Sequence, residues 1–222
     1  ICETTADELV SLMVGRQISS AYGERHITGS DEVVLQVKGY TNKKLKNVSF
    51  ELRRGEILGI SGLVGSGRTE LARAIFGLDK ISSGEIYIEN KKVEIKSPQD
   101  AIKNRMGFIP EDRRGAGLIL SDSIAFNLTL TVLEKFIRGI HVDRKKELSI
   151  VDKYINTLDI KTTGPSQLCR ELSGGNQQKV VISKWMATEP KYLIMDEPTR
   201  GIDVGAKKEI YDLMNRLAAE GI

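Results

Sequence analysis

A glycine-rich segment constrains the fold of this chain more than any other feature. Gly62-Leu-Val-Gly-Ser-Gly-Arg-Thr69 follows a short apolar run at residues 57–61 and precedes residues with helical spacing. Glycines allow backbone N–H groups to curl around phosphate oxygens, and a helix N-terminus adds partial positive charge at the same place. A strand, such a loop and a helix, in this order, predict a phosphate-binding loop in an α/β fold.

Six residues of this loop are the predicted phosphate-binding residues. Thr69 is also expected to offer its hydroxyl to Mg²⁺. Arg68 stands where loops of this kind usually carry lysine. Its planar guanidinium is bulkier than the compact ammonium that the loop encloses, so we expect phosphate to bind but catalysis at this loop to be impaired. The six residues are Gly62, Gly65, Ser66, Gly67, Arg68 and Thr69.

Two adjacent carboxylates follow a second apolar run, which is predicted to be a buried strand at residues 192–195. Asp196 is expected to hold Mg²⁺, through water. Glu197 is expected to polarise the attacking water as a general base. An Asp-Glu pair after a strand indicates by itself only a solvated turn. The phosphate loop about 130 residues earlier makes nucleotide hydrolysis the favoured interpretation.

The hydrophobic pattern predicts an α/β fold with a largely parallel core sheet. An antiparallel β subdomain and an inserted, mainly helical subdomain at about residues 112–190 accompany the core. Helices are expected at residues 68–76, from Ser97 and Pro98, after Asp143, and around Ile210 and Leu217. Strands are expected at residues 33–37, 48–52, 57–61, 85–88, 92–95, 106–109 and 192–195.

Composition excludes several other classes of protein. The net charge of +3 over 222 residues does not indicate the concentrated basic patch of a nucleic-acid-binding protein. Cys2 and Cys169 have no metal-ligand spacing and argue against a disulfide framework, which fits a reducing cytosol. No apolar run reaches the length of about 18 residues that a membrane-spanning helix needs.

A third motif, Leu172-Ser-Gly-Gly-Asn-Gln-Gln178, lies between the phosphate loop and the Asp-Glu pair. Ser173 supplies a hydroxyl, and Gly174 and Gly175 permit close backbone approach at a helix N-terminus aimed at a γ-phosphate. Gln177 belongs to the same predicted nucleotide contact. In isolation this segment could equally be a helix-capping turn. In this order with the other two motifs it resembles the signature motif of ATP-binding-cassette ATPases.

The resemblance covers nearly the whole chain. It is similar to the C-terminal ATPase domain of the ribose, galactoside, xylose and arabinose importers, in which an arginine at the position of Arg68 is also typical. The resemblance implies that Glu111 acts near Mg²⁺, where most relatives carry glutamine, and that Asp203 joins two ATPase halves. Tyr40, 22 residues before Gly62, either stacks on adenine or is a tyrosine at the end of a turn. The similar segments are residues 45–77, 111–117, 172–180 and 196–210.

The resemblance implies a larger machine. Two ATPase domains of one polypeptide dimerise head to tail, with ATP and Mg²⁺ between the phosphate loop of one and the signature of the other. This half then supplies an intact signature in trans while its own phosphate loop is degenerate. Closure drives membrane permease subunits, which accept sugar from a binding protein. The location implied is peripheral, at the cytoplasmic face of the plasma membrane, with no nucleic-acid partner.

The resemblance also implies a domain organisation. Residues 1–31 are expected to be the tail of a preceding ATPase domain and a linker, with a short helix opened by Thr5; a frayed arm is the alternative. Residues 32–222 are expected to be a cassette truncated before its last strands. One of those strands would lie beside residues 57–61, so we expect unpaired backbone groups there.

Two rival functions are considered. A non-transport cassette protein predicts long charged insertions or coiled-coil heptads, and the sequence has neither. A regulatory domain that binds ATP without hydrolysing it stays open because of Arg68.

Overall fold

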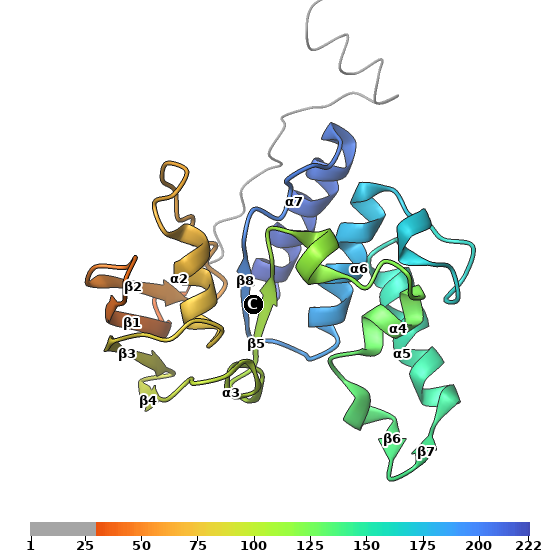
Figure 1. Ribbon diagram of the computed structural model, residues 1–222, viewed down its shortest axis with the longest axis horizontal. Helices are drawn as coiled ribbons and strands as arrows, with labels where there is room; N and C mark the ends of the chain where they lie inside the picture. The colour runs from red at the N-terminus through yellow and green to blue at the C-terminus, as the bar shows by residue number, and fades with distance from the viewer. Residues whose placement is uncertain (1–29) are drawn as a thin grey trace, which may run out of the picture.

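The computed structural model describes residues 30–222, and three regions lie side by side in it (Figure 1). An antiparallel sheet with helix α2 forms one side, two parallel strands lie at the centre, and helices form the other side. The helix expected after Thr5 lies outside the described residues, as does nearly all of the linker. In the described part of the chain, no helix is long and apolar enough to cross a membrane.

The antiparallel sheet has the strand order β2-β1-β3-β4. Val37 of the central strand pairs with Phe50 on one side and with Ile86 on the other. Helix α2 (Arg68–Ile75) packs on this sheet through buried Leu71. The antiparallel subdomain is therefore confirmed. Its strands are β1 (Val33–Thr41), β2 (Val48–Arg53), β3 (Ser83–Ile88) and β4 (Lys91–Val93).

Two parallel strands form the described part of the core sheet. Strands β5 (Met106–Ile109) and β8 (Tyr192–Met195) have the bounds that their apolar runs predict, and Ile109 pairs with Met195. Helix α3 (Pro98–Lys103) leads into β5. Its first turn is capped by Ser97, whose hydroxyl accepts a hydrogen bond from the Asp100 backbone N–H.

The connection from β5 to β8 is mainly helical, as expected. Its helices pack against α7 (Val204–Ala219) through fully buried residues that include Val181, Ile182 and Ile210. A β hairpin projects from this region, with Ile140 at its exposed tip. The elements are η1 (Arg113–Gly117), α4 (Ile124–Thr129), η2 (Leu133–Lys135), β6 (Ile137–Arg138), β7 (His141–Val142), α5 (Arg144–Thr157), η3 (Cys169–Glu171) and α6 (Gly174–Met186).

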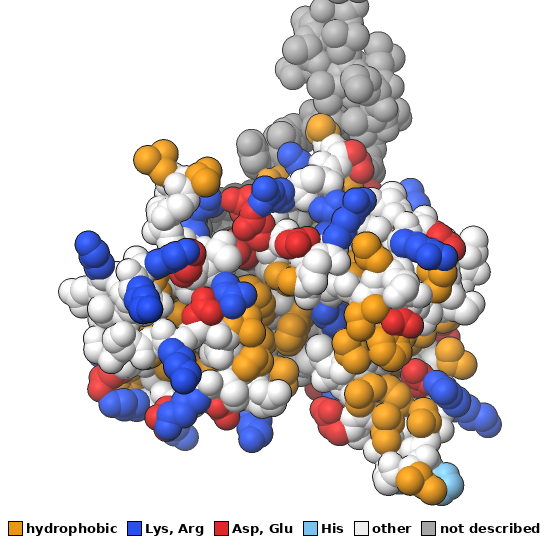
Figure 2. Space-filling view, in the orientation of Figure 1, with side chains coloured by type: hydrophobic (Ala, Val, Ile, Leu, Met, Phe, Trp, Pro, Cys, Tyr) orange, Lys and Arg blue, Asp and Glu red, His pale blue; other side chains and the backbone are white. Residues whose placement is uncertain are grey.

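The surface carries both signs of charge. Figure 2 shows Lys and Arg side chains interspersed with Asp and Glu on the face in view. Apolar side chains are exposed over the hairpin region of the same view, where Ile140 and Val142 are 94% and 40% exposed.

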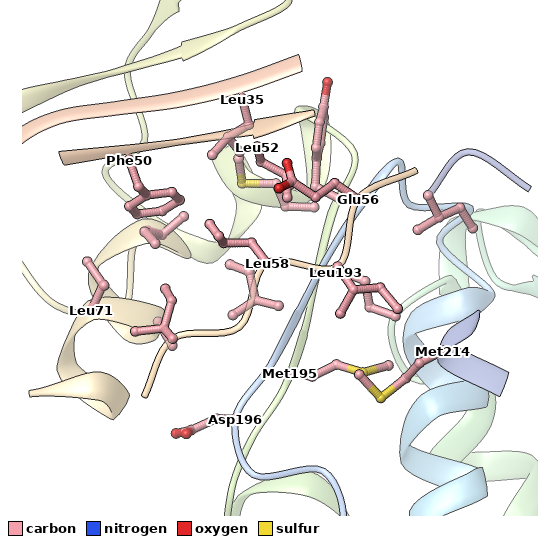
Figure 3. A pocket seen from close by; sticks show the side chains of 18 of the residues that line it. Leu35, Phe50, Leu52, Glu56, Leu58, Leu71, Leu193, Met195, Asp196 and Met214 are labelled. Atoms are coloured by element: carbon pink, nitrogen blue, oxygen red, sulfur yellow. The ribbon is translucent and has the colours of Figure 1, made fainter. Parts of the chain in front are cut away.

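The strand predicted at residues 57–61 is wrong for the structure as described. This segment joins none of the sheets in the described residues. Ile57, Leu58 and Ile60 are 40%, 38% and 47% exposed. A strand needs a hydrogen-bonded neighbour. Here an apolar cavity of about 260 Å³ lies between this segment and β8, and Leu193 and Met195 of β8 line it (Figure 3). Unpaired backbone groups at residues 57–61 stay a prediction, and among the described residues this segment pairs with no strand.

Candidate nucleotide-binding site

The phosphate loop depends on its glycines for geometric reasons. Gly65 and Gly67 have φ values of +83° and +94°, a region that residues with a Cβ rarely adopt. A Cβ at Gly62 would lie 2.5 Å from the Ser66 Oγ. Residues 62–66 are exposed, and α2 begins directly after Gly67. The loop therefore presents backbone N–H groups and a helix N-terminus to solvent, which suits an anionic phosphate.

Thr69, a predicted metal-site residue, and Glu111, a predicted catalytic residue, come from distant parts of the chain and meet beside this loop. Thr69 lies in the first turn of α2, and Glu111 follows the end of β5. The Thr69 hydroxyl donates to the Glu111 Oε2 across 3.4 Å. Folding thus brings a hydroxyl and a carboxylate to one place, and both are hard oxygen ligands of the kind that Mg²⁺ prefers.

Asp196 ends β8 with a buried carboxylate. Its backbone N–H donates to the Ile109 carbonyl at 2.9 Å, which extends the β5–β8 pairing to this residue. Asp196 is 7% exposed, and its Oδ2 has no hydrogen-bond partner among the described residues. In Figure 3 the Asp196 carboxylate lies apart from Phe50 and Leu52, at one end of the cavity. A buried carboxylate oxygen without a partner is costly, so this atom fits a site for a cation or its water.

The donor set fits Mg²⁺ bound together with a nucleotide. Within residues 30–222, no group of three or more His, Cys, Asp or Glu side chains is arranged to hold a metal ion. Mg²⁺ is commonly held by one or two carboxylates with phosphate oxygens completing its shell. Asp196, Glu111 and the Thr69 hydroxyl provide that number of protein oxygens.

Arg68 contacts the predicted general base. Its Nη2 lies 3.2 Å from the Glu197 Oε1, with side chains that are 30% and 38% exposed. Glu197 has a φ of +43°, an uncommon conformation for a residue other than glycine. Arg68, Asp196 and Glu197 all line the same cavity. The guanidinium of the phosphate loop therefore forms an ion pair with the carboxylate that is the predicted general base.

The signature motif lies on the other side of the central strands. Figure 1 shows α2 and α6 on opposite sides of β5 and β8. Ser173 caps α6, since its hydroxyl accepts a hydrogen bond from the Asn176 backbone N–H at 3.4 Å, and it also accepts one from the Asn176 side chain at 3.0 Å. A Cβ at Gly175 would lie 2.6 Å from the Ala206 Cβ on α7. The glycines are therefore required for close packing as well as for an open helix N-terminus.

Two predicted nucleotide contacts are corrected by burial. Tyr40 is 2% exposed in the core, and burial raises the pKa of its hydroxyl to about 12. Tyr40 lies in the core near the end of β1, which favours the alternative without an adenine contact. Gln177 is also 2% exposed, and its Nε2 donates to the Cys169 carbonyl at 3.1 Å. This amide packs η3 against α6 and does not face a ligand.

Asp203 is an exposed helix cap. Its carboxylate accepts a hydrogen bond from the Ala206 backbone N–H at 2.8 Å. Its role between ATPase halves stays a prediction, as do the roles of the phosphate-loop and signature residues.

Sequence reasoning missed two arginines. Arg200 forms an ion pair with Glu111. Arg113 donates from Nη1 to the Arg200 carbonyl at 2.6 Å and from Nη2 to the Gly201 carbonyl at 2.9 Å. Both residues lie in segments that resemble the family, but 87 positions separate them and no pattern within either segment predicts the contact. Only the folded chain reveals these contacts.

A glycine cradle at a helix N-terminus, beside a hydroxyl and a buried unpartnered carboxylate, defines this chain as a P-loop nucleotide-binding domain. The family model described as "ABC transporter" matches residues 45–200. The chain belongs to the ABC transporter family, as one of its ATPase domains.

Several curated relatives are similar over the whole chain. The ribose import ATP-binding protein RbsA of Bacillus licheniformis is 51% identical over 100% of this chain and 45% of its own length. The RbsA proteins of Bacillus subtilis and Halalkalibacterium halodurans are 50% and 49% identical, over 100% of this chain and 45% and 44% of their own lengths. This chain spans less than half of these relatives.

Solved structures of ATP-binding cassettes share the fold. A nucleotide-free cassette from an ABC transporter superposes with a TM-score of 0.73 at 24% identity, over 86% of this chain and 79% of that one. A dimeric cassette bound to ADP and Pi, in a post-hydrolysis state, gives a TM-score of 0.69 at 26% identity, with coverage of 84% and 83%.

Proposed function

We propose that this chain is an ATP-binding domain of a sugar importer, coupling ATP binding and hydrolysis to carbohydrate uptake. The observation that carries the proposal is the exposed glycine loop beside the unpartnered Asp196 oxygen. The similarity to ribose import ATP-binding proteins supports sugar uptake, and ribose is the first sugar to test.

Within this proposal the chain's own phosphate loop is impaired. The Arg68–Glu197 ion pair supports this, because the guanidinium lies on the Glu197 carboxylate that the attacking water would have to contact. The signature at Ser173, Gly174 and Gly175 acts in trans, on the phosphate loop of another ATPase domain. Both glycines lie at the N-terminus of α6, where backbone N–H groups face outward.

The residues have distinct roles in the proposed mechanism. Backbone N–H groups of residues 62–67 bind the phosphates, and Thr69, Glu111 and Asp196 hold Mg²⁺. The cation neutralises charge on the phosphate oxygens when it is bound. Glu197 accepts a proton from the attacking water once Arg68 has left its carboxylate.

The partners follow from the same proposal. They are a first ATPase domain in the same polypeptide, membrane permease subunits and, indirectly, a sugar-binding protein. The domain then works at the cytoplasmic face of the plasma membrane. Residues 1–31 are the proposed join to the first ATPase domain, and this chain is the second.

The test measures binding of labelled ATP and release of phosphate by the 222-residue chain. We expect Mg²⁺-dependent binding with slow turnover. Arg68→Lys should raise turnover by about tenfold, since a freed general base contributes at least that much. Turnover of several per second by the unmodified, monomeric chain would contradict an impaired loop, and absence of ATP binding would contradict the proposal as a whole.

A second candidate is an ATP-binding regulatory domain that does not hydrolyse ATP, and the Arg68–Glu197 ion pair favours it. Sugar uptake by vesicles that contain the full-length polypeptide and its permease separates the two. ATP-dependent uptake supports the importer. Binding of ATP without uptake or phosphate release supports the regulatory domain.

A further inference from the structure

Glu111 has two partners in the structure, one on each carboxylate oxygen: the Thr69 hydroxyl on Oε2 and the Arg200 guanidinium on Oε1. Its side chain, 29% exposed, accepts a hydrogen bond from Thr69 and forms an ion pair with the Arg200 Nη1. The Thr69 hydroxyl marks the side on which the proposed Mg²⁺ site lies. A guanidinium and a divalent cation on one carboxylate repel each other at short range, so Glu111 serves one of them at a time.

The backbone of Arg200 is fixed in place by a second arginine. Arg113, two residues after Glu111, donates to the Arg200 carbonyl at 2.6 Å and to the Gly201 carbonyl at 2.9 Å. The segments after β5 and after β8 therefore hold each other by two sets of contacts, which we call the clasp. The Arg113 side chain binds the backbone of Arg200 and Gly201, and the Arg200 side chain binds Glu111.

The clasp is built into the fold at more than one point. A Cβ at Gly174 would lie 3.0 Å from the Arg113 Nη2, so the guanidinium packs directly against the signature glycine. The same guanidinium is close to Gly201, where a Cβ would lie 3.4 Å from Nη1. Arg113 thus has little freedom to move, whereas the Arg200 side chain, 62% exposed, is free to swing into solvent.

We propose that Arg200 is an autoinhibitory latch on the nucleotide site, and that Arg113 is a positioning residue for it. In the latched arrangement the Arg200 guanidinium forms an ion pair with Glu111. Glu111 can bind Mg²⁺ only after this ion pair has opened. Arg113 meanwhile holds the Arg200 backbone near Glu111, so that the ion pair can form again. This inference rests on the proposed Mg²⁺–nucleotide site.

The test measures the affinity of the chain for a fluorescent ATP analogue, with Mg²⁺ and with EDTA. Removing the latch with Arg200→Gln should tighten binding about two- to fivefold in Mg²⁺, the range of a partly exposed ion pair. Binding in EDTA should not change, because the latch competes only with the cation. In a Glu111→Gln background, Arg200→Gln should have no effect in either condition.

Two further variants make the test specific. Arg144→Gln removes an exposed arginine that pairs with Glu147 on α5, away from the site, and should change nothing. Arg113→Met should also tighten Mg²⁺-dependent binding, and Arg113→Lys, which retains a charged donor, should do so less. Melting curves of every variant show that it is folded.

The outcomes are distinguishable. Equal affinity of Arg200→Gln and the parent in Mg²⁺ overturns the latch, and so does equal tightening in Mg²⁺ and EDTA. Tightening that persists in the Glu111→Gln background also overturns it. Failure of the folded parent and of all variants to bind nucleotide overturns the proposed function itself, and the latch with it.

Discussion

At the scale of single residues, two separate constraints both favour glycine at position 175. Its position at the N-terminus of α6 suits a γ-phosphate contact, and its Cα lies so close to α7 that a Cβ would be 2.6 Å from the Ala206 Cβ. A substitution here therefore acts on packing as well as on charge. Variants at this position need a control that separates the two.

Gly175→Asp should abolish ATPase activity of the full-length polypeptide with its permease, whereas Arg68→Ala should cost much less. A carboxylate about 4 Å from a phosphate charge costs roughly 4 kcal/mol at an effective dielectric constant of 20. Arg68 serves a site that is already impaired. Gly175→Ala is the control for packing and should lie between the two. Loss of turnover in Arg68→Ala with near-normal turnover in Gly175→Asp would show that the roles are reversed.

Asp196→Asn should weaken the response of nucleotide binding to Mg²⁺. The buried Oδ2 has no protein partner, so the variant loses a charged acceptor for the cation or its water. A lost hydrogen bond to a charged group corresponds to about tenfold in affinity or more. Binding in EDTA should stay close to that of the parent. An unchanged response to Mg²⁺ would place the cation elsewhere.

At the scale of elements, a buried lysine joins α6 to η1. Lys184 is 7% exposed and donates to the Gly117 carbonyl at the end of η1, the element that carries Arg113. Burial lowers the pKa of Lys184 to about 8 from its usual value of 10.5. Below that pKa the folded chain holds a buried positive charge on Lys184. The stability of the folded chain therefore depends on pH through this residue.

Lys184 should contribute a rise of about 1 kcal/mol to the free energy of unfolding between pH 8 and pH 9. In this window the unfolded lysine keeps its proton while the folded one loses it, so the unfolded state binds more protons and stability increases with pH. The contribution is lost as pH falls through the folded pKa of about 8. Urea unfolding at both pH values measures this, with Lys184→Met as the control that removes the titration. Equal slopes in parent and variant would exclude Lys184 as the cause.

Cys169 limits the pH range over which the effect of Lys184 can be measured. Burial raises the pKa of its thiol to about 11 from 9, so above pH 9 the unfolded state loses this proton first. Stability from this group therefore falls as pH rises, and opposes the effect of Lys184. The measurement is clearest at or below pH 9.

At the scale of the whole molecule, residues 57–61 are the weakest part of the described sheet structure. They join none of the described sheets, and Ile57, Leu58 and Ile60 are at least 38% exposed. The adjoining cavity of about 260 Å³ separates the antiparallel sheet from β8 (Figure 3). An apolar segment without a sheet partner adds little stability and leaves backbone groups to solvent.

The 222-residue chain should therefore unfold with a midpoint below about 60 °C, within or under the usual range for mesophilic domains. Circular dichroism and calorimetry of the purified chain provide the measurement. A single cooperative transition well above that temperature would mean that residues 57–61 are paired in solution in a way that the structure does not show.

The amino-acid sequence by itself determined the features that depend on near neighbours in the chain. The bounds of β5 and β8 follow from short apolar runs, and the N-caps at Ser97 and Ser173 bond within three residues. The glycine loop also lies in one stretch. Its role as a phosphate-binding loop can therefore be predicted from the sequence alone. The family can be predicted from the order of three such local motifs.

Only the tertiary structure decided which of those residues meet and which are covered. Tyr40 and Gln177 look like ligand contacts in sequence, but packing against distant segments buries them. Residues 57–61 have the apolar pattern of a strand, but sheet pairing needs a second segment. The clasp of Arg113, Arg200 and Glu111 joins loops that follow different strands. Such contacts depend on how the strands pair, and no pattern within one segment encodes them.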